Sequence, residues 1–256
     1  MDTDNARLRS AADDFKNVSL PTESINADTP LEQRTIAIER AHNPPGGQSK
    51  SAFQQFSDLP LFSTVRFELK RSNWMTSDEL TACRNLISST SQKNYEASCI
   101  GWNPEDKKEE MSHADMMYLL VRQAQKYIDS DNEDSQKPST ASLAGCPGAI
   151  LGFLSFKLEP EDEENEMFRP VAYIYEVHLD KQLRNQGLGA RLIQWVEDQA
   201  RMASISKMML TVFAVNKGAR RMYERQGFVR DPLSPEDKVT RRRVIEPDYI
   251  IMSKEI

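Results

Sequence analysis

The sequence has few of the residues that build disulfide frameworks or metal centres. Its 256 residues include only three cysteines, Cys83, Cys99 and Cys146, and three histidines, scattered along the chain. Three cysteines cannot all pair with one another, and their spacing matches no zinc-binding pattern. We therefore expect no metal site, no structural disulfides and a reducing compartment.

Long apolar runs and an excess of positive charge are also lacking. The longest apolar run, 148–156, is far shorter than the roughly 20 residues that a membrane helix needs, so we expect no membrane partner. Lys and Arg number 33 against 39 Asp and Glu, which gives a formal net charge of −6. An acidic chain is a poor general binder of nucleic acid, so we expect no direct nucleic-acid partner and a preference for basic ones.

The chain divides into an extension and a longer patterned region. Residues 1–28 are polar and without periodicity, which is typical of disorder. A helix is expected near 30–42, because Thr29 and Pro30 suit its start and a Pro-Gly run follows its end. We predict an N-terminal extension over 1–58 and one domain over 59–256, with a polar inserted loop near 123–145.

The patterned region alternates strands and helices. Thr76 and Glu79 form a capping box, which predicts a helix running to about Ser88, and a short charged helix is expected from Asn103. Helices are also expected over 187–202 and 216–225. The expected strands are 61–70, 116–122, 148–158, 171–179, 207–215 and 249–253. This order predicts a layered α/β (α+β) fold.

The segment 184–190 carries the clearest chemical signal. A strand ends at Leu179, and two closely spaced glycines, Gly187 and Gly189, then open a helix. Such a turn gathers unpaired backbone N–H groups at the positive end of a helix dipole, which favours an anion such as a pyrophosphate. Arg184 adds a positive charge. A glycine pair alone is weak evidence for a function.

The surrounding sequence makes the signal specific. Arg184-x-x-Gly187-x-Gly189 follows Tyr-Glu-Val-His-Leu, and a later segment reads Asn216-x-x-Ala219-x-x-x-Tyr223-x-x-x-Gly227-Phe228. This ensemble resembles the GCN5-related N-acetyltransferase (GNAT) superfamily over about 148–253. The resemblance implies a central twisted mixed β-sheet flanked by helices and acetyl-CoA as co-substrate. It also implies a coenzyme site formed by Val177, His178, Leu179, Arg184, Asn185, Gln186, Gly187, Leu188, Gly189, Ala190, Asn216 and Tyr223.

Further segments are similar to the histone-specific, D-type N-alpha-acetyltransferases. They include Asn94-Tyr95-Glu96, Gly101-Trp102, 107–111, 173–177 and 209–213. This second resemblance spans about 60–253 and the helix near 30–42. It implies acetyl transfer to the N-terminal serine amine of histones that begin Ser-Gly-Arg-Gly. The chain departs from that family at 123–145, at the acidic run 159–166 and at a charged insertion, 236–246.

Glu176 is the expected catalytic base. It lies within an apolar strand, where a carboxylate is costly unless it is paired or functional. A raised pKa would let it take a proton from an amine whose own pKa is near 8. The alternative is a structural acid bonded to a backbone or tyrosine group. The resemblance points to the same residue, with Tyr175 beside it as the second catalytic position.

Substrate-binding residues are expected along a slot for the peptide. The resemblance implies a peptide slot, with carboxylates that receive the arginine of the third substrate residue. The alternative for the tyrosines is that they pack in the core. The alternative for the acidic run 159–166 is that it forms a solvated loop. The expected substrate-binding residues are Tyr95, Trp102, Glu159, Glu161, Tyr173, Ser234 and Tyr249.

The sequence therefore predicts an acetyl-CoA-dependent protein N-terminal acetyltransferase that uses direct attack in a ternary complex and no metal. Expected partners are histone N-terminal tails, and we expect a monomer located in the nucleus and cytoplasm. Two alternatives stay open. One is a GNAT enzyme acting on a lysine side chain or small amine, and the other is a non-catalytic module that binds acetyl-CoA or histones.

Overall fold

The computed structural model describes residues 25–43, 53–124, 148–161, 169–241 and 243–256. The expected segment 1–28, apart from its last four residues, and most of the expected loop at 123–145 lie outside these ranges, as does most of the acidic run. The boundary between an extension and a domain near residue 58 stays a prediction.

The expected elements appear close to their predicted bounds. The helices are α2 (Leu31–His42), α3 (Ser77–Glu96), α4 (Pro104–Met111), α5 (Leu188–Met202) and α6 (Lys217–Arg225). The strands are β1 (Val65–Arg71), β2 (Met117–Gln123), β3 (Ile150–Pro160), β4 (Pro170–Leu179), β5 (Lys207–Phe213), β6 (Val229–Arg230), β7 (Lys238–Val239), β8 (Val244–Ile245) and β9 (Tyr249–Glu255). Short 3₁₀ turns occupy Gln54–Phe56, Ser72–Trp74 and Lys181–Leu183.

The capping box at the start of α3 is confirmed. The hydroxyl of Thr76 accepts a hydrogen bond from the Glu79 amide, and the Glu79 carboxylate accepts one from the Thr76 amide. The helix continues eight residues beyond its expected end, to Glu96. This difference matters for function, because the added turns carry Thr90 and Tyr95.

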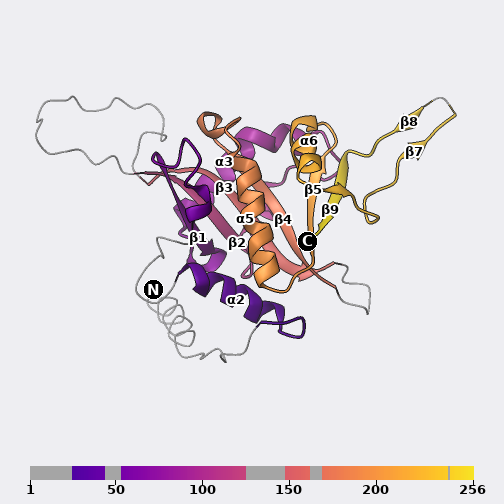
Figure 1. The fold of residues 1–256 in the computed structure, drawn as a ribbon. Helices are drawn as coiled ribbons and strands as arrows, with labels where there is room; N and C mark the ends of the chain where they lie inside the picture. Colours follow the sequence, from indigo (N-terminus) through magenta and orange to yellow (C-terminus); the bar gives the residue numbers. More distant parts are fainter. Residues whose placement is uncertain (1–24, 44–52, 125–147, 162–168, 242) are drawn as a thin grey trace, which may run out of the picture.

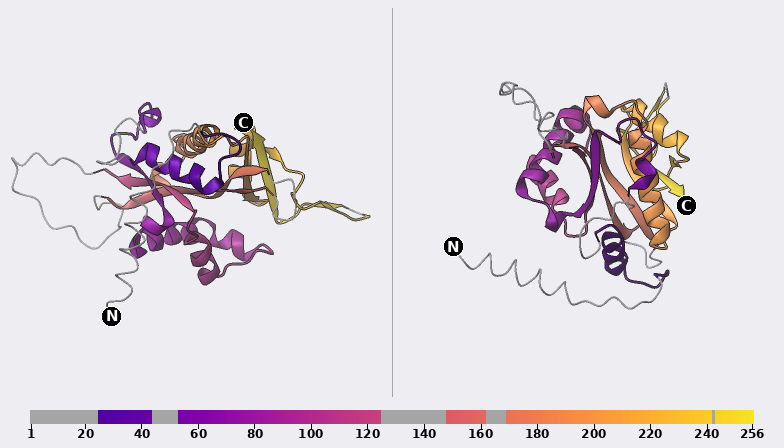
Figure 2. Two further views of the ribbon diagram at one scale, coloured as in Figure 1. Left: turned by 90° about the horizontal axis from the view of Figure 1, so that it is seen from below. Right: turned by 60° about the vertical axis from the view of Figure 1, so that its left-hand side comes forward.

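A seven-stranded sheet forms the centre of the molecule, in the order β1-β2-β3-β4-β5-β9-β6 (Figure 1). All neighbouring strands are antiparallel except β4 and β5. Helices α2 and α5 cover one face of the sheet, and α3 and α4 cover the other (Figure 2). The fold is the expected mixed sheet flanked by helices.

The N-terminal helix α2 is fastened to the C-terminal end of α5. The buried guanidinium of Arg34 donates hydrogen bonds to the carbonyl oxygens of Ala203 and Ser204, at 3.3 and 3.2 Å. Cationic groups favour helix C-termini, where carbonyl oxygens lack helical partners. His42, farther along α2, packs edge-on against Trp195 of α5.

Strand β4 contains an irregularity in its pairing with β3. Ser155 pairs with Glu176, but Phe156 pairs with Ile174, so Tyr175 has no partner on β3. An extra residue of this kind is a β-bulge, and it shifts the alternation of side chains by one position. Before the bulge Ile174 points into the core under α5, and after it Val177 packs against that same core.

Strands β4 and β5 pair over only three residues and then separate. The last parallel pair is Ile174 with Leu210, although β4 continues to Leu179 and β5 to Phe213. The separated strands leave backbone groups of 175–179 without a partner on the β5 side. This opening holds the candidate site.

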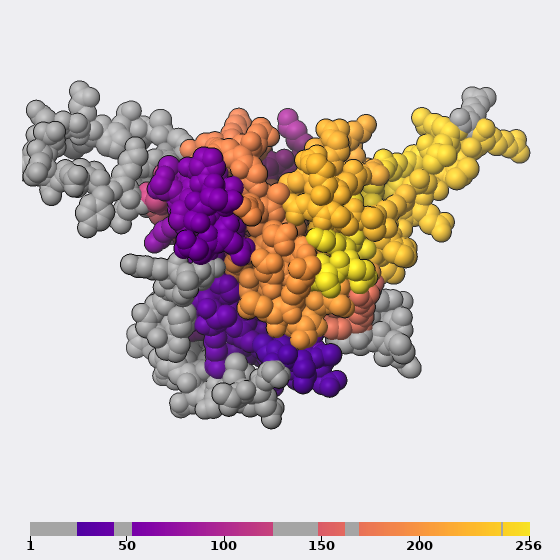
Figure 3. Space-filling view, viewed as in Figure 1, coloured from indigo at the N-terminus to yellow at the C-terminus, as the bar shows by residue number. Residues whose placement is uncertain are grey.

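The charged insertion at 236–246 forms a two-stranded hairpin, β7–β8. It projects from the body of the molecule (Figure 3). Its acidic flanks are paired to the body, since Arg230 contacts Asp237 and Arg220 contacts Glu246. Within the described ranges, no helix combines the length and the apolarity that a membrane span requires.

Candidate active site

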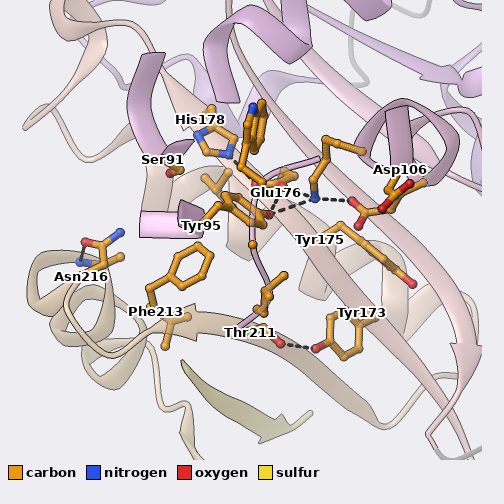
Figure 4. A pocket seen from close by; sticks show the side chains of 18 of the residues that line it. Ser91, Tyr95, Asp106, Tyr173, Tyr175, Glu176, His178, Thr211, Phe213 and Asn216 are labelled. Atoms are coloured by element: carbon orange, nitrogen blue, oxygen red, sulfur yellow. Dashed lines mark hydrogen bonds and ion pairs between the residues drawn. The ribbon is translucent and has the colours of Figure 1, made fainter. Parts of the chain in front are cut away.

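A pocket of about 400 Å³ lies where β4 and β5 separate, between α3, α4 and α6. Nine of the residues expected in the site line this one pocket, and Figure 4 shows several of them pointing toward one another. They are Tyr95, Trp102, Tyr173, Tyr175, Glu176, Val177, His178, Asn216 and Tyr223.

The bulge explains why so many of these side chains share one face. In a regular strand, neighbouring residues point to opposite faces of the sheet. The unpaired Tyr175 removes that alternation at one step, so that Tyr173, Tyr175, Glu176 and His178 all reach the pocket.

Three side chains make hydrogen bonds to Glu176 in the pocket. Its Oε1 accepts hydrogen bonds from the Tyr95 hydroxyl at 2.7 Å and from Lys107 Nζ at 3.0 Å. Its Oε2 lies 2.5 Å from Nε2 of His178. The other ring nitrogen of His178 lies 2.6 Å from the Thr90 hydroxyl. The carboxylate is buried, with 6% of the side chain exposed.

The expected raised pKa of Glu176 is wrong. Burial alone would raise this pKa, but the His178 ring, the Lys107 ammonium and the Tyr95 hydroxyl outweigh burial and hold the pKa at about 2. Glu176 is thus a stable carboxylate at neutral pH. Because an ionised carboxylate only accepts hydrogen bonds, Nε2 of His178 carries the proton between them.

The predicted phosphate turn has the backbone shape that such a site needs. Gly187 caps α5 with a φ of +80°, and a Cβ added there would meet no heavy atom within 4 Å. Asn185 also has a positive φ, of 60°. The first helical hydrogen bond runs from the Arg191 amide to the Gly187 carbonyl, so the amides of 188–190 have no helical acceptor.

Side chains around this turn stabilise it internally. Nε of Arg184 donates to the Leu179 carbonyl at 2.9 Å, and the Gln186 amide donates to the Gln182 carbonyl at 2.6 Å. Leu188 is buried in the core, so only its backbone faces the turn. Arg184 therefore ties the turn to the end of β4 and stays exposed to solvent.

The expected substrate-binding acids separate in the structure. Glu159 accepts a hydrogen bond from the Tyr175 hydroxyl at 2.8 Å and pairs with Lys157, which places it beside the pocket. Glu161 is instead paired with the buried Lys207, and it does not line the pocket.

Two other expected residues also lie away from the pocket lining. The Ser234 hydroxyl is buried and accepts a hydrogen bond from the Ile251 amide at 3.2 Å. Tyr249 begins β9 opposite Phe213. Ser234 thus supports the turn before the β7–β8 hairpin, and a structural role for this residue accounts for its contacts.

Sequence reasoning assigned no role to Lys107 and Glu110 of α4, which also line the pocket. Lys107 Nζ contacts Glu110 at 2.7 Å, Tyr95 at 2.9 Å and Glu176. The signal available was the spacing of Lys107 and Met111, the two buried residues of α4. A lysine in the buried stripe of a charged helix indicates a buried acidic partner.

No group of three or more His, Cys, Asp or Glu in the described ranges is arranged to hold a metal ion. Unpaired strand edges and a network of titratable side chains lie in the pocket, and the backbone anion turn at 184–190 lies outside the pocket lining. This arrangement suits a phosphate-bearing cofactor that extends from the turn along the split to Glu176.

Comparisons with known proteins agree with this geometry. A profile of the acetyltransferase (GNAT) family matches residues 104–228. The chain is 38% identical over 101 residues to N-alpha-acetyltransferase 40 of Saccharomyces cerevisiae, which covers 34% of this chain and 35% of that protein. It is 35% identical over 79 residues to the uncharacterized N-acetyltransferase YycN of Bacillus subtilis, covering 31% and 47%.

The chain spans between a third and a half of the length of these two relatives. Among solved structures, NAA60 of Arabidopsis thaliana with a bisubstrate analogue is 15% identical, with a TM-score of 0.48 over 75% of this chain and 99% of that one. The family match covers β4, the turn at 184–190, α5 and α6. Residues 104–228 therefore match the acetyltransferase (GNAT) family.

Proposed function

We propose that this protein transfers the acetyl group of acetyl-CoA to the N-terminal α-amine of a protein substrate. Three facts support the proposal: the match to the GNAT family, the similarity to an N-alpha-acetyltransferase from yeast, and the chemistry of the pocket. Acetyl-CoA supplies an acetyl group activated as a thioester, and the residues described above bind and orient the two substrates.

The turn and the split fit acetyl-CoA. The open space above Gly187 and the unpaired amides of 188–190 suit a pyrophosphate. The gap between β4 and β5 admits an extended arm, and the backbone N–H groups of 177–179 would polarise the thioester carbonyl. Asn216 and Tyr223 also line the pocket, and we expect them beside the leaving thiol.

The observation that carries the proposal is the acidity of the pocket. Its lining includes the carboxylates of Asp106, Glu110 and Glu176 but only one ammonium, Lys107. Carboxylates that outnumber cations attract a positively charged substrate. A free protein N-terminus, with a pKa near 8, enters such a pocket as a cation and reacts after losing a proton.

For the identity of the substrate we propose a histone N-terminus beginning Ser-Gly-Arg-Gly. Glu159 supports this proposal, because it lies beside the pocket and is available to an arginine near the substrate N-terminus. The ring centres of Tyr173 and Tyr175, which both line the pocket, lie 5.2 Å apart, and these rings would flank the peptide backbone. The proposal includes a monomer that works in the nucleus and cytoplasm.

A peptide panel tests both levels of the proposal. Release of CoA thiol is measured with Ser-Gly-Arg-Gly, Ala-, Met- and acidic-start peptides, each with a free and a blocked N-terminus. Turnover only with free N-termini supports α-amine transfer, and a preference for Ser-Gly-Arg-Gly supports the histone substrate. Equal turnover of blocked peptides that contain lysine would identify a lysine acetyltransferase, and absence of turnover would identify a binding module.

A further inference from the structure

A lysine already pairs with the carboxylate that we expect to receive a substrate arginine. Lys157 Nζ lies 2.8 Å from Oε2 of Glu159, and it also lies 5.7 Å from the centre of the Tyr175 ring. A carboxylate beside an aromatic face suits a bound cationic side chain. A residue of the protein itself thus takes the place that we propose for a residue of the substrate.

This pair of residues lies at the edge of the pocket. Lys157 and Glu159 are two residues apart in β3, so their side chains leave the same face of the sheet. Lys157 is the cross-strand partner of Tyr173, and Glu159 accepts the hydrogen bond from the Tyr175 hydroxyl. Both tyrosines line the pocket. The side chains of Lys157 and Glu159 are 19% and 17% exposed, so a peptide at the pocket edge reaches them.

An arginine that binds Glu159 needs the oxygen that Lys157 contacts. Oε2 of Glu159 accepts the hydrogen bond from Tyr175 at 2.8 Å in addition to its contact with Lys157. A guanidinium pairs best with a carboxylate through two parallel hydrogen bonds, one to each oxygen. Because a carboxylate oxygen has two lone pairs, such an arginine must displace one of these two groups. The Lys157 ammonium leaves more easily, since its long stem lets the charge turn to solvent.

The neighbouring acid is paired with a lysine that cannot leave. Glu161 pairs with Lys207, whose side chain is 7% exposed and which also pairs with the fully buried carboxylate of Asp231. Moving Lys207 away would leave the charge of Asp231 buried without a partner, which is strongly unfavourable. Lys157 pairs with one carboxylate among the described residues, and a substrate arginine would replace it there. Glu159 can therefore exchange its cation, whereas Glu161 cannot.

We propose that Lys157 competes with the substrate for Glu159 and so limits the affinity for an arginine near the substrate N-terminus. The inference rests on the proposed function and deepens it, because it names the group that the substrate must displace. A cationic side chain that displaces Lys157 restores the charge balance of Glu159. A peptide with a neutral residue at that position leaves the pair of Lys157 and Glu159 intact and gains no contact there.

The KM values for two peptides test this competition. The peptides are Ser-Gly-Arg-Gly and Ser-Gly-Ala-Gly, which have the same free N-terminal amine. Lys157→Met keeps most of the apolar stem and removes the ammonium. It should lower KM for the arginine peptide about fivefold, the upper range for an ion pair that solvent reaches, and change KM for the alanine peptide less than about twofold.

Three further variants separate competition from other effects. Lys157→Arg retains a cation that can pair with both oxygens of Glu159, so KM for the arginine peptide should stay at or above the wild-type value. Lys108→Met removes an exposed positive charge outside the pocket lining and should leave both KM values unchanged. In Glu159→Gln, the addition of Lys157→Met should not lower KM for the arginine peptide, because the shared carboxylate is gone.

An unchanged or higher KM of Lys157→Met for the arginine peptide would overturn the inference. An equal decrease for the alanine peptide or in Lys108→Met would do the same, as would a KM of Lys157→Arg below the wild-type value. A kcat and a calorimetric acetyl-CoA affinity of Lys157→Met within about threefold of wild type show that this variant is folded.

The same measurements distinguish this inference from the proposed function. If the wild-type KM does not depend on the arginine, the competition is wrong, but transfer to an N-terminal amine stands. If the wild type releases no CoA thiol with either peptide, both the competition and the proposed function are wrong.

Discussion

Replacing Lys107 by methionine should destabilise the protein strongly, although the change occurs on a short charged helix. Methionine keeps most of the apolar stem but removes the ammonium that Glu176 and Glu110 share. Breaking a buried ion pair by removing one partner costs about 3–5 kcal/mol, since the other charge stays buried. Glu176 keeps its hydrogen bonds to Tyr95 and His178, so we expect the free energy of unfolding to fall by about 3 kcal/mol, the lower end of this range.

The assay is thermal unfolding at pH 7, with Lys108→Met as a matched control on the exposed side of α4. For a chain of this size, 1 kcal/mol shifts Tm by about 2–4 °C, so Lys107→Met should lower Tm by about 6–12 °C. Adding Glu176→Gln removes the carboxylate charge that Lys107→Met leaves buried without its partner. The decrease in Tm of the double variant should therefore be smaller than the sum of the decreases of the two single variants. A strictly additive double variant, or a Tm within 2 °C of wild type for Lys107→Met, would refute this reasoning.

Acid unfolding provides a second measurement on the same network. The folded pKa of Glu176 is about 2, below its ordinary value of 4.5, so the unfolded chain binds the proton first as the pH falls. Its stabilising contribution, about 3 kcal/mol, is complete above pH 4.5 and is lost between pH 4.5 and 2. Glu110 opposes this trend, since its pKa is raised. In Lys107→Met the pKa of Glu176 rises, so the free energy of unfolding should fall less between pH 4.5 and 2 than it does in the wild type.

Four other substitutions test the turn, the strand pairing and the two acids. Gly187→Trp should abolish acetyl-CoA binding, because φ is +80° and the space above the turn is needed for the coenzyme; unchanged affinity by calorimetry would remove the turn from the site. Gly152→Ala should lower stability by about 1–3 kcal/mol in denaturant unfolding, since the new Cβ would lie 2.9 Å from the His178 carbonyl oxygen, and an unaltered midpoint would contradict this. Glu159→Gln should raise KM for an arginine-containing peptide about tenfold, as expected for a lost charged hydrogen bond, whereas Glu161→Gln should leave KM unchanged; equal effects would contradict the placement of the two acids.

Most of the fold could be predicted because each element carries its own local signal. The capping box at Thr76 marks the start of α3, and the apolar stripe of α5 and the alternation of β4 are visible in the sequence. The last two turns of α3 were missed, because their residues are mainly polar and packing against the sheet, rather than propensity, keeps them helical. The β7–β8 hairpin was missed because its strands are only two residues long.

The site was predictable where backbone shape determines function and less so where charge balance does. Gly187 is recognisable because its φ of +80° is a backbone conformation that favours glycine. The pKa of Glu176 was predicted in the wrong direction, since burial was visible in the sequence but its three donors were not. Two of those donors, Tyr95 on α3 and Lys107 on α4, lie 81 and 69 residues from Glu176 in the chain, and no local pattern shows that Lys107 reaches across to β4.

The unpaired residue in β4 also bears on how this cleft could have arisen. Without Tyr175, the residues 172–174 and 176–179 would read as one uninterrupted alternating strand, with the same side chains facing the core. The parallel pairing with β5 stops at Ile174, directly before that extra residue. One inserted codon at this point is compatible with an otherwise regular strand, because the alternation toward the core continues on both sides of it. The extra residue lies where β4 leaves β5, and it contributes an aromatic group to the lining of the opening.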